Sequence, residues 1–595
     1  MPVVDDGTRR RWRRGFGRRR KNALQLGQQA DQQIEKLLIR RFDRLLSVRR
    51  FIFLWVSLFL LLYLASFIQI RSLSSYYQTL KPVPGGLYSE GLIGTFSNAN
   101  PIYASSASDT AVSHLVFSGL FRYSNDNVLV GDLAKDWQLN ASQTRYTVHL
   151  RHGVTWHDGQ PFTADDVIFT YHTIQNIEAQ SPLYVGWQGV NVTKQDAYTV
   201  NFDLPNALGS FPYSLTNGIL PAHLFKKTVA AQMRSASFNV SPVGTGPFEW
   251  KFVEVTDAGS AQRQQRISLA AFDHYYGGRP KLDGFTLTTF TDDQHLIAAF
   301  NKKQLNAMSG LDTLPDEFAK DDSVHAYTTP LTSAVMAFFN NSRANLSDAL
   351  VRKALVSGAN RAQLPGLLHY PVNLTDGPLL KGQLGYDPSI TELPYNVDSA
   401  NQLLDQAGWR RGADGIRVKD GKPLTLSLAS QNVTDYTQVA QFLQKQWDQL
   451  GIKVAVHYYS SDDIQTAIIT SHDFDILLYG INIGVDPDVF VYWDSSQANL
   501  TSQGHLNLSE YKSKAVDQAL ESARTRANPS LRIAKYQSFL STWVQDAPAL
   551  ALYQPNYLYI TRGPVFDYNR KAANSPADRF YNVNQWMIRQ RHQNI

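Results

Sequence analysis

The sequence of 595 residues contains no cysteine. Structural disulfides, thiolate nucleophiles, cysteine–zinc sites and a lipid anchor on an N-terminal cysteine are therefore excluded. The nucleophile-elbow pattern G-x-S-x-G, the phosphate-binding P-loop and the zincin pattern HExxH are also missing, and none of the 14 histidines is in HxxxH spacing. We therefore expect no enzymatic activity, no cofactor and no metal site.

One long hydrophobic run stands out near the N-terminus, FIFLWVSLFLLLYLASFIQI at residues 51–70. Twenty residues without a charge are enough to cross about 30 Å of hydrocarbon as a helix. A cleaved signal peptide is the alternative, but the run is longer than a signal-peptide core and ends in a poor cleavage site. We predict one uncleaved transmembrane signal anchor that places this segment in the lipid bilayer.

Basic residues are concentrated before this run. Residues 1–50 hold 15 lysines and arginines against 5 acidic residues, whereas the rest of the chain holds 42 against 46. The run RRRWRRGFGRRRK at 9–21 is compatible with nucleic-acid binding, but we favour a topology determinant lying on anionic lipid headgroups, with 30–50 as an interfacial helix. The positive-inside rule then predicts a single-pass cell-membrane protein with a cytoplasmic tail and an extracytoplasmic body, and no nucleic-acid partner.

The body has the composition of a folded protein, with 43% apolar residues, and its length exceeds that of one compact core. A stretch rich in Ser, Pro and Gly at 71–85 is expected to be a linker. Alternating apolar residues predict strands at 146–152, 197–204, 266–272, 285–290, 424–430 and 452–459. Helical spacing predicts helices at 164–174, 399–407, 437–450 and 530–545. The order strand, helix, strand within 424–459 indicates an α/β fold.

The stretch HGVTWHDGQPFTADDV at 152–167 allows two interpretations. His157 and Asp158 adjoin, which suggests catalysis, but the sequence offers no third group to complete such a unit. The alternative is a turn that launches a helix, with Thr163 and Asp166 in capping-box spacing. We favour the structural interpretation.

The same stretch is part of a segment, 133–171, that resembles the signature of family 5 extracellular solute-binding proteins, the peptide- and nickel-binding receptors of ABC importers. Further segments resemble that family in the expected order, and together they cover about residues 86–590. They are VFSGLFRY at 116–123, PVGTGPFEW at 242–250, AFDHYYGGRPKLDGFTL at 271–287, FFNNSRANLSDALVRKALVSGANRAQL at 338–364, NVDSANQLLDQAGW at 396–409 and HDFDILLYGINIGVDPDVF at 472–490.

The resemblance implies a two-lobed, periplasmic-binding-protein-like α/β fold of type II, in the three-domain variety of family 5, preceded by one transmembrane helix. Such a protein closes its lobes around a ligand and catalyses no reaction. The expected division is a tail at 1–50, the anchor at 51–70, a linker at 71–85, domain I at 86–125, 241–327 and 549–595, domain II at 126–240, and domain III at 328–548.

In the family's peptide binders, a carboxylate pairs with the charged amino end of the ligand. This carboxylate usually lies in the loop that here reads GINIGVDPD, residues 480–488. Dipeptide-binding relatives carry an Asp three residues before the DPD, where this chain has Ile483. Asp486 or Asp488 is the candidate substitute, and a purely structural corner is the equal alternative. The strand-to-loop stretch 95–106 is expected to face the cleft with polar side chains.

Trp187 and Trp493 are candidates for lining apolar side-chain pockets, with a core position as the alternative for each. The residues expected to contact ligand are therefore Asn98, Asn100, Tyr103, Trp187, Asn482, Asp486, Asp488 and Trp493.

The sequence thus predicts a monomeric, membrane-anchored receptor that captures peptides or other small polar solutes and passes them to ABC permease subunits. Two alternatives stay open. One is a sensor or scaffold that signals through its cytoplasmic tail, and the other is the same fold binding a metal complex or a sugar.

Overall fold

The computed structural model describes residues 48–594 except 258, 260–262, 369, 371, 461, 462 and 501–505. The predicted interfacial helix and most of the basic tail lie outside the described residues. The chain forms two compact units, Met1–Lys81 with Gln590–Ile595, and Pro82–Arg589.

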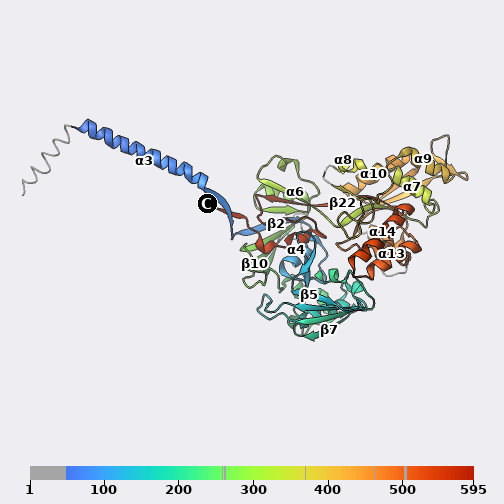
Figure 1. The fold of residues 1–595 in the computed structure, drawn as a ribbon, viewed down its shortest axis with the longest axis horizontal. Coiled ribbons are helices and arrows are strands. Elements are labelled where there is room, and N and C mark those ends of the chain that lie inside the picture. The colour runs from blue at the N-terminus through green and yellow to red at the C-terminus, as the bar shows by residue number, and fades with distance from the viewer. Residues whose placement is uncertain are drawn as a thin grey trace, which may run out of the picture. The chain divides into compact units, whose positions relative to one another are not determined.

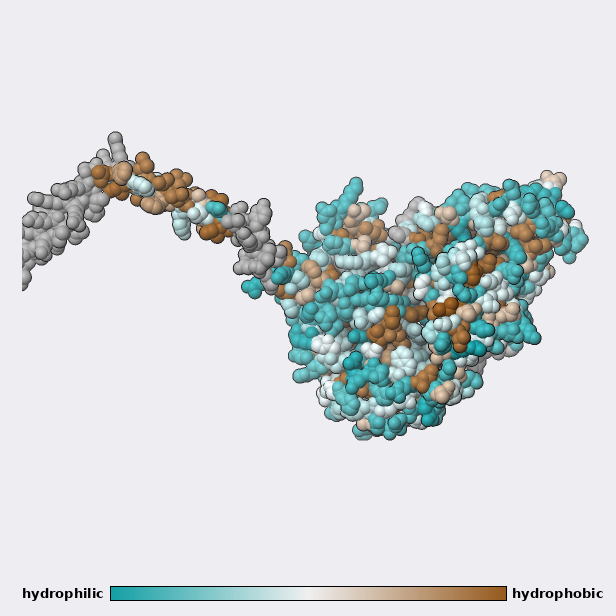
Figure 2. Space-filling view, viewed as in Figure 1, coloured by the Kyte–Doolittle hydropathy of each residue, from teal (hydrophilic) through white to brown (hydrophobic). Residues whose placement is uncertain are grey.

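In the first unit, helix α3 (Arg49–Tyr77) contains the predicted anchor. Its segment Phe51–Arg71 is long and apolar enough to span a membrane and none of its residues is buried, so α3 is a candidate transmembrane anchor. Figure 2 shows this segment as a nearly continuous apolar surface, in contrast to the mixed surface of the body.

The stretch expected to be a linker has regular structure instead. Its first residues continue α3, and the next form strand β1 (Gln78–Val83), which pairs with β24 (Arg589–Asn594) near the C-terminus. Pro82 fits this pairing because a two-stranded ribbon has open edges at which a missing N–H is tolerated.

The second unit contains the two lobes of the fold, and lobe one is built on a seven-stranded sheet (Figure 1). The strands run in the order β13 (Val324–Pro330), β23 (Asn556–Arg562), β12 (Ala307–Ser309), β2 (Leu87–Ile93), β11 (Gly284–Phe290), β10 (Gln264–Ala271) and β9 (Phe248–Thr256). Only β2 makes parallel pairs, with β11 and β12. Helix α4 (Ala107–Val116) packs into the core on one face, and α6 (Asp293–Asn301) packs into the core on the other.

An antiparallel four-stranded sheet belongs to the same lobe. Its order is β5 (Ala134–Leu139), β6 (Arg145–Leu150), β8 (Thr199–Asp203) and β7 (Asn191–Asp196). Its inward side chains and those of the seven-stranded sheet form one continuous hydrophobic core. Helix α5 (Ala164–Gln175) packs on this small sheet and begins with the predicted capping box between Thr163 and Asp166.

Lobe two is built on a six-stranded sheet. Its order is β15 (Asn373–Leu374), β22 (Ala549–Gln554), β14 (Ser333–Phe339), β21 (Ile476–Asn482), β19 (Thr425–Gln431) and β20 (Lys453–Tyr459). Side chains of β14 alternate between two cores. Helices α7 (Ala349–Ser357), α9 (Val397–Gln406) and α10 (Thr434–Gln449) cover one face, and α13 (Lys514–Arg524) and α14 (Pro529–Asp546) cover the other (Figure 1).

The predicted helices and strands of the body are confirmed, with end shifts of at most three residues. The strand–helix–strand order is confirmed by β19, α10 and β20, whose strands pair in parallel. Gly451 ends this helix with a positive φ of 80°, a conformation that glycine adopts without strain.

The chain crosses between the lobes twice, from β13 to β14 and from β22 to β23. The two crossings contact each other, because Leu331 N–H donates to the carbonyl of Pro555 at 3.0 Å. Strand β22 lies in the six-stranded sheet, so the last crossing falls at Pro555 and not before Ala549, where the expected division between domains III and I placed it.

Candidate functional site

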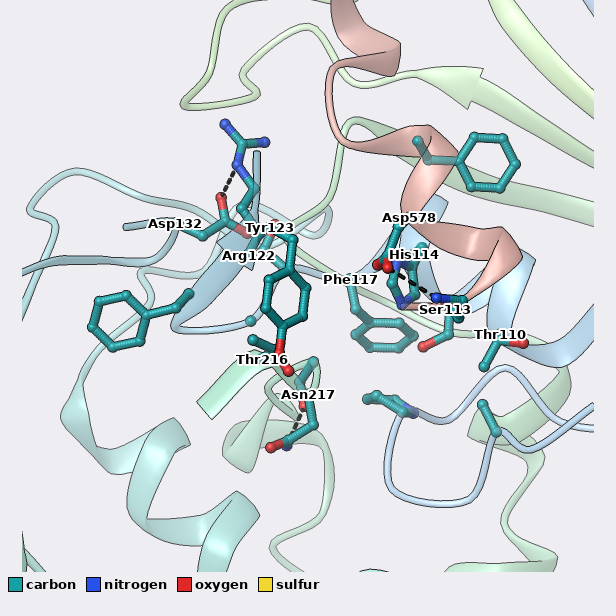
Figure 3. Close-up of a pocket in the computed structure, with 18 of the residues that line it drawn as sticks. Thr110, Ser113, His114, Phe117, Arg122, Tyr123, Asp132, Thr216, Asn217 and Asp578 are labelled. Carbon is teal, nitrogen blue, oxygen red and sulfur yellow. Dashed lines mark hydrogen bonds and ion pairs between the residues drawn. The ribbon is translucent and has the colours of Figure 1, made fainter. Parts of the chain in front are cut away.

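Lobe one contains a cavity of about 610 Å³. This volume lies within the range of small-molecule and cofactor sites, about 300–1,000 Å³. Its wall is formed by α4, strand β3 (Phe121–Tyr123), the segments 182–187 and 213–218, and the C-terminal segment 574–584 (Figure 3). Segments from both ends of the lobe-one sequence therefore meet around one space.

His114 and Asp578 lie side by side on one wall (Figure 3). His114 is on the last turn of α4, whose neighbouring residues are buried in the core, so its exposed surface faces the cavity. Burial lowers the pKa of the imidazole, and the nearby Asp578 carboxylate opposes this shift. This lowered pKa favours the uncharged form of the imidazole.

The backbone around Asp578 holds its carboxylate in place. Its Oδ2 accepts hydrogen bonds from the N–H groups of Asn574 (2.7 Å) and Ser575 (3.0 Å), which starts the short helix Pro576–Phe580. The adjacent Arg579 forms a buried ion pair with Glu90 of β2, which fixes this helix to the sheet. The position of the carboxylate is thus set by the fold and not by a flexible loop.

Another wall carries a second charged pair. Arg122 Nε lies 3.6 Å from Asp132, whose carboxylate also accepts from the Tyr276 hydroxyl. Burial raises the pKa of Asp132, and the Arg122 charge opposes this. Between the two walls, Tyr123 points toward Thr216 (Figure 3), and burial followed by the charge of Asp578 raises the pKa of its hydroxyl.

Asp486, the first candidate for the ammonium anchor, is already paired. Its two oxygens accept from Arg532 of α14 at 2.7 and 2.6 Å, and both side chains are 6% exposed. Although burial opposes the charged guanidinium, Asp486 raises the pKa of Arg532 above its usual value. A bidentate pair of this kind leaves no carboxylate charge to be balanced by a ligand.

Asp488, the second candidate, joins the two lobes. Its Oδ2 accepts from the Ser210 hydroxyl of lobe one at 2.9 Å and lies 3.3 Å from Arg524 at the end of α13. Gly209 N–H donates to the Arg524 carbonyl at 2.8 Å, and Ala527 N–H donates to Gln143 at 2.9 Å. We call these contacts between 143, 209–210, 488 and 524–527 the interlobe clasp.

Packing explains why this chain has Ile483 where dipeptide-binding relatives have an aspartate. Its side chain is 6% exposed in the core that contains α13 and α14, and its N–H donates to Thr332 at the lobe crossing at 2.9 Å. An aspartate there would be a buried charge, which is costly unless paired. Nearby Asn482 is exposed and uses its side-chain oxygen to accept from Gly484 N–H at 3.1 Å.

The stretch 95–106 uses its polar side chains within the protein. Asn100 is fully buried and donates to Asn239 at 3.0 Å, Asn98 accepts from the N–H of Asn100 at 2.8 Å, and the Tyr103 hydroxyl donates to the Ala179 carbonyl at 2.5 Å. Only small neighbours in this stretch, including Pro101, reach the cavity wall.

The two tryptophans differ in position. Trp187 packs against Tyr171, with ring centroids 4.1 Å apart, and also lines the cavity. Trp493 has no exposed surface and packs between Phe338 and Trp543, so the core alternative holds for it. Of the eight residues expected to contact ligand, all of them described, only Trp187 lies in the cavity wall.

His157 is structural, as predicted. Its Nε2 lies 3.0 Å from the Gly246 carbonyl and its Nδ1 accepts from Gly244 N–H at 3.2 Å, so it braces the GTGP turn. Burial lowers its pKa to about 4. Its neighbour Asp158 pairs instead with His223 at 2.7 Å.

Sequence reasoning missed His114, Tyr123 and Asp578. No local pattern marks them, because α4 and the C-terminal segment are distant in sequence and pack against each other only in the folded lobe. Within the described part of the chain, no group of three or more His, Asp or Glu side chains is arranged to hold a metal ion.

Two α/β lobes joined by two crossings, with fixed polar groups around a cavity, form the architecture expected of a solute-binding protein. The residues 128–502 match the family model of bacterial extracellular solute-binding proteins, family 5 middle region. Because this match covers more than half of the sequence, the chain belongs to family 5 of the bacterial extracellular solute-binding proteins.

Curated relatives agree with this assignment. The oligopeptide-binding protein AppA of Bacillus subtilis is 26% identical over 532 residues, which cover 85% of this chain and 92% of AppA. The dipeptide-binding protein of Escherichia coli is 24% identical over 462 residues, which cover 73% of this chain and 82% of that protein.

Solved structures share the fold. AppA from Bacillus subtilis in complex with a nonapeptide matches with a TM-score of 0.69 and 25% identity, covering 86% of this chain and all of AppA. NikZ from Campylobacter jejuni in complex with Ni(L-His) matches with a TM-score of 0.70 and 24% identity, covering 84% of this chain and 99% of NikZ. The chain is therefore a solute-binding protein of an ABC importer, a transport receptor and not an enzyme, with a small solute as ligand and a permease as partner.

Proposed function

We propose that this receptor captures peptides outside the cytoplasm and delivers them to its permease while anchored to the membrane by α3. The observation that carries the ligand class is the lobe-one cavity, whose wall combines aromatic rings with fixed charged groups. Aromatic surfaces bind varied side chains with little loss of conformational entropy, and fixed polar groups orient a peptide backbone. The oligopeptide- and dipeptide-binding relatives support this class.

Capture by lobe closure is part of the proposal. The two crossings at 330–333 and 554–556 are the only strand connections between the lobes in the described residues, so they are the natural hinge. The interlobe clasp supplies contacts that form when the lobes approach. Ligand binding energy and clasp energy together then favour the closed form that a permease recognises.

Thermal unfolding of the full chain in detergent tests the ligand class. The probes are lysine-free peptide pools from dipeptides to nonapeptides, with a nickel–histidine complex and simple sugars as controls. A ligand of the folded state raises Tm in proportion to RT ln(1 + [L]/Kd). A shift with peptides supports the proposal, whereas a shift only with the nickel complex or a sugar contradicts it.

The membrane topology needs a separate test. Arg49 and Arg50 precede the apolar segment, and the basic tail is expected on the cytoplasmic side. Protease added to intact cells should digest a tag at the C-terminus without lysis. Digestion only after lysis would contradict an extracytoplasmic body.

A further inference from the structure

We propose that the wall formed by His114 and Asp578 binds the ammonium group of the ligand, which in a lysine-free peptide is its amino terminus. This inference rests on the proposed peptide-binding function and specifies its chemistry. It moves the amino-end site from the Asp-Pro-Asp loop of lobe two to the cavity of lobe one.

The carboxylate of Asp578 is only half used. Its Oδ2 accepts two backbone N–H groups and lies 3.8 Å from Arg570. Its Oδ1 has no hydrogen-bond partner among the described residues, and the side chain lines the cavity. A charged acceptor therefore faces the space where a ligand would lie.

The imidazole of His114 adds a second acceptor. In the part of the chain that the structure describes, no hydrogen bond or ion pair joins it to Asp578 or to any other group. The lowered pKa of the ring favours its uncharged form, in which one ring nitrogen carries a lone pair. A donor lying between the two side chains can bond to both of them.

An ammonium group matches this wall in number and charge. It carries three N–H donors and one positive charge. Asp578 and His114 supply two acceptors, and the hydroxyl of Ser113, beside His114 on α4 and also in the wall, supplies a third. A metal ion is a poorer match, because two such side chains do not complete a coordination sphere.

The alternative acidic site is occupied by the protein itself. Asp486 is bonded through both oxygens to Arg532, and Asp488 is engaged by Ser210 and Arg524. A peptide ammonium placed there would have to displace a buried guanidinium or break the clasp. The free carboxylate oxygen of Asp578 requires neither change.

The test is isothermal titration calorimetry on the full chain with a lysine-free tetrapeptide pool, free and N-acetylated. Acetylation should weaken binding by about tenfold to a hundredfold, the usual effect of losing a hydrogen-bonded charge. The Asp578→Asn variant should bind the free pool as weakly as the wild type binds the acetylated pool. Acetylation of the peptides should then reduce the affinity of this variant only slightly. That loss of coupling localises the ammonium at Asp578.

Asp126→Asn is the matched control, since Asp126 is an exposed carboxylate paired with Lys571 and lies outside the cavity wall. It should keep the full sensitivity to acetylation. If Asp578→Asn folds poorly, His114→Gln serves instead and should reduce the sensitivity severalfold. Equal binding of free and acetylated pools would overturn this inference alone, whereas no binding of any peptide pool overturns the proposed function with it.

Discussion

The loop after β21 and the short helix near the C-terminus both place aspartates near the meeting point of the lobes. In the first, Asp486 and Asp488 are engaged by arginines from α13 and α14. In the second, Asp578 lines the cavity, its Oδ2 accepts two backbone N–H groups and lies 3.8 Å from Arg570, and its Oδ1 has no hydrogen-bond partner among the described residues. The family resemblance pointed to the first loop, but the free acceptor lies in the second segment.

The difference shows that the availability of a carboxylate depends on residues distant in sequence. Arg532 lies on a helix 46 residues after Asp486, and nothing in the DPD motif indicates this partner. The loop thus has two structural roles, one in the lobe-two core and one in the interlobe clasp. The proposed ammonium site therefore lies in lobe one and not in this loop.

The largest expected effect tests the structural role of Asp486. Asp486→Ala leaves Arg532 as an unpaired buried charge and should destabilise lobe two by about 3–5 kcal/mol, measured by calorimetric unfolding. The double variant Asp486→Ala/Arg532→Met should recover most of this loss. If the Asp486→Ala protein keeps its Tm but no longer binds peptide, Asp486 is the ligand anchor. The roles assigned to the two aspartate-bearing segments would then be reversed.

A smaller effect is expected at the clasp. Ser210→Ala removes one hydrogen bond to Asp488 and should weaken peptide binding by about threefold to tenfold, mainly through faster dissociation in stopped-flow fluorescence. The factor should be the same for free and acetylated peptides, because the clasp acts on closure and not on the ammonium. Ser142→Ala, an exposed serine outside the clasp, is the control and should have no effect. A larger loss for free than for acetylated peptides would place the ammonium at the clasp.

The smallest effect concerns pH. The folded pKa of His114 lies below the unfolded value of 6.5, so its contribution to stability is complete above pH 6.5 and is lost as the pH falls below it. The charged groups that face it are Asp578, Asp132, Arg570 and Arg579. From pH 7.5 to pH 5, the Tm of wild type should fall further than that of His114→Gln. Parallel pH profiles for the two proteins would contradict a lowered pKa at His114.

Much of the fold was predictable from the sequence, since periodicity and capping signals are local. The helix over 164–174 was expected from Thr163 and Asp166, and the capping box is present. The regular structure within 71–85 was not predicted, because it depends on pairing with a strand from the other end of the chain. Its Ser, Pro and Gly content gave no sign of that partner.

The site was less predictable for the same reason. Asn100 and Tyr103 look like ligand contacts in a polar loop, yet each bonds to a distant part of lobe one. Trp187 packs on Tyr171 and also lines the cavity, so its predicted contact with a ligand stays a prediction. His114 and Asp578 become a pair only once α4 packs against the C-terminal segment.

Photo-crosslinking tests most directly the central claim that the amino end of the peptide lies beside His114 and Asp578. The probe is a lysine-free peptide with a photoreactive diazirine on the side chain of its first residue, so that its amino group stays free. Mapping the crosslinks on the full chain by mass spectrometry should place them in α4 and in the segment 574–584, beside His114 and Asp578. Crosslinks concentrated at 482–494 would instead place the amino end at the Asp-Pro-Asp loop, and would contradict the account.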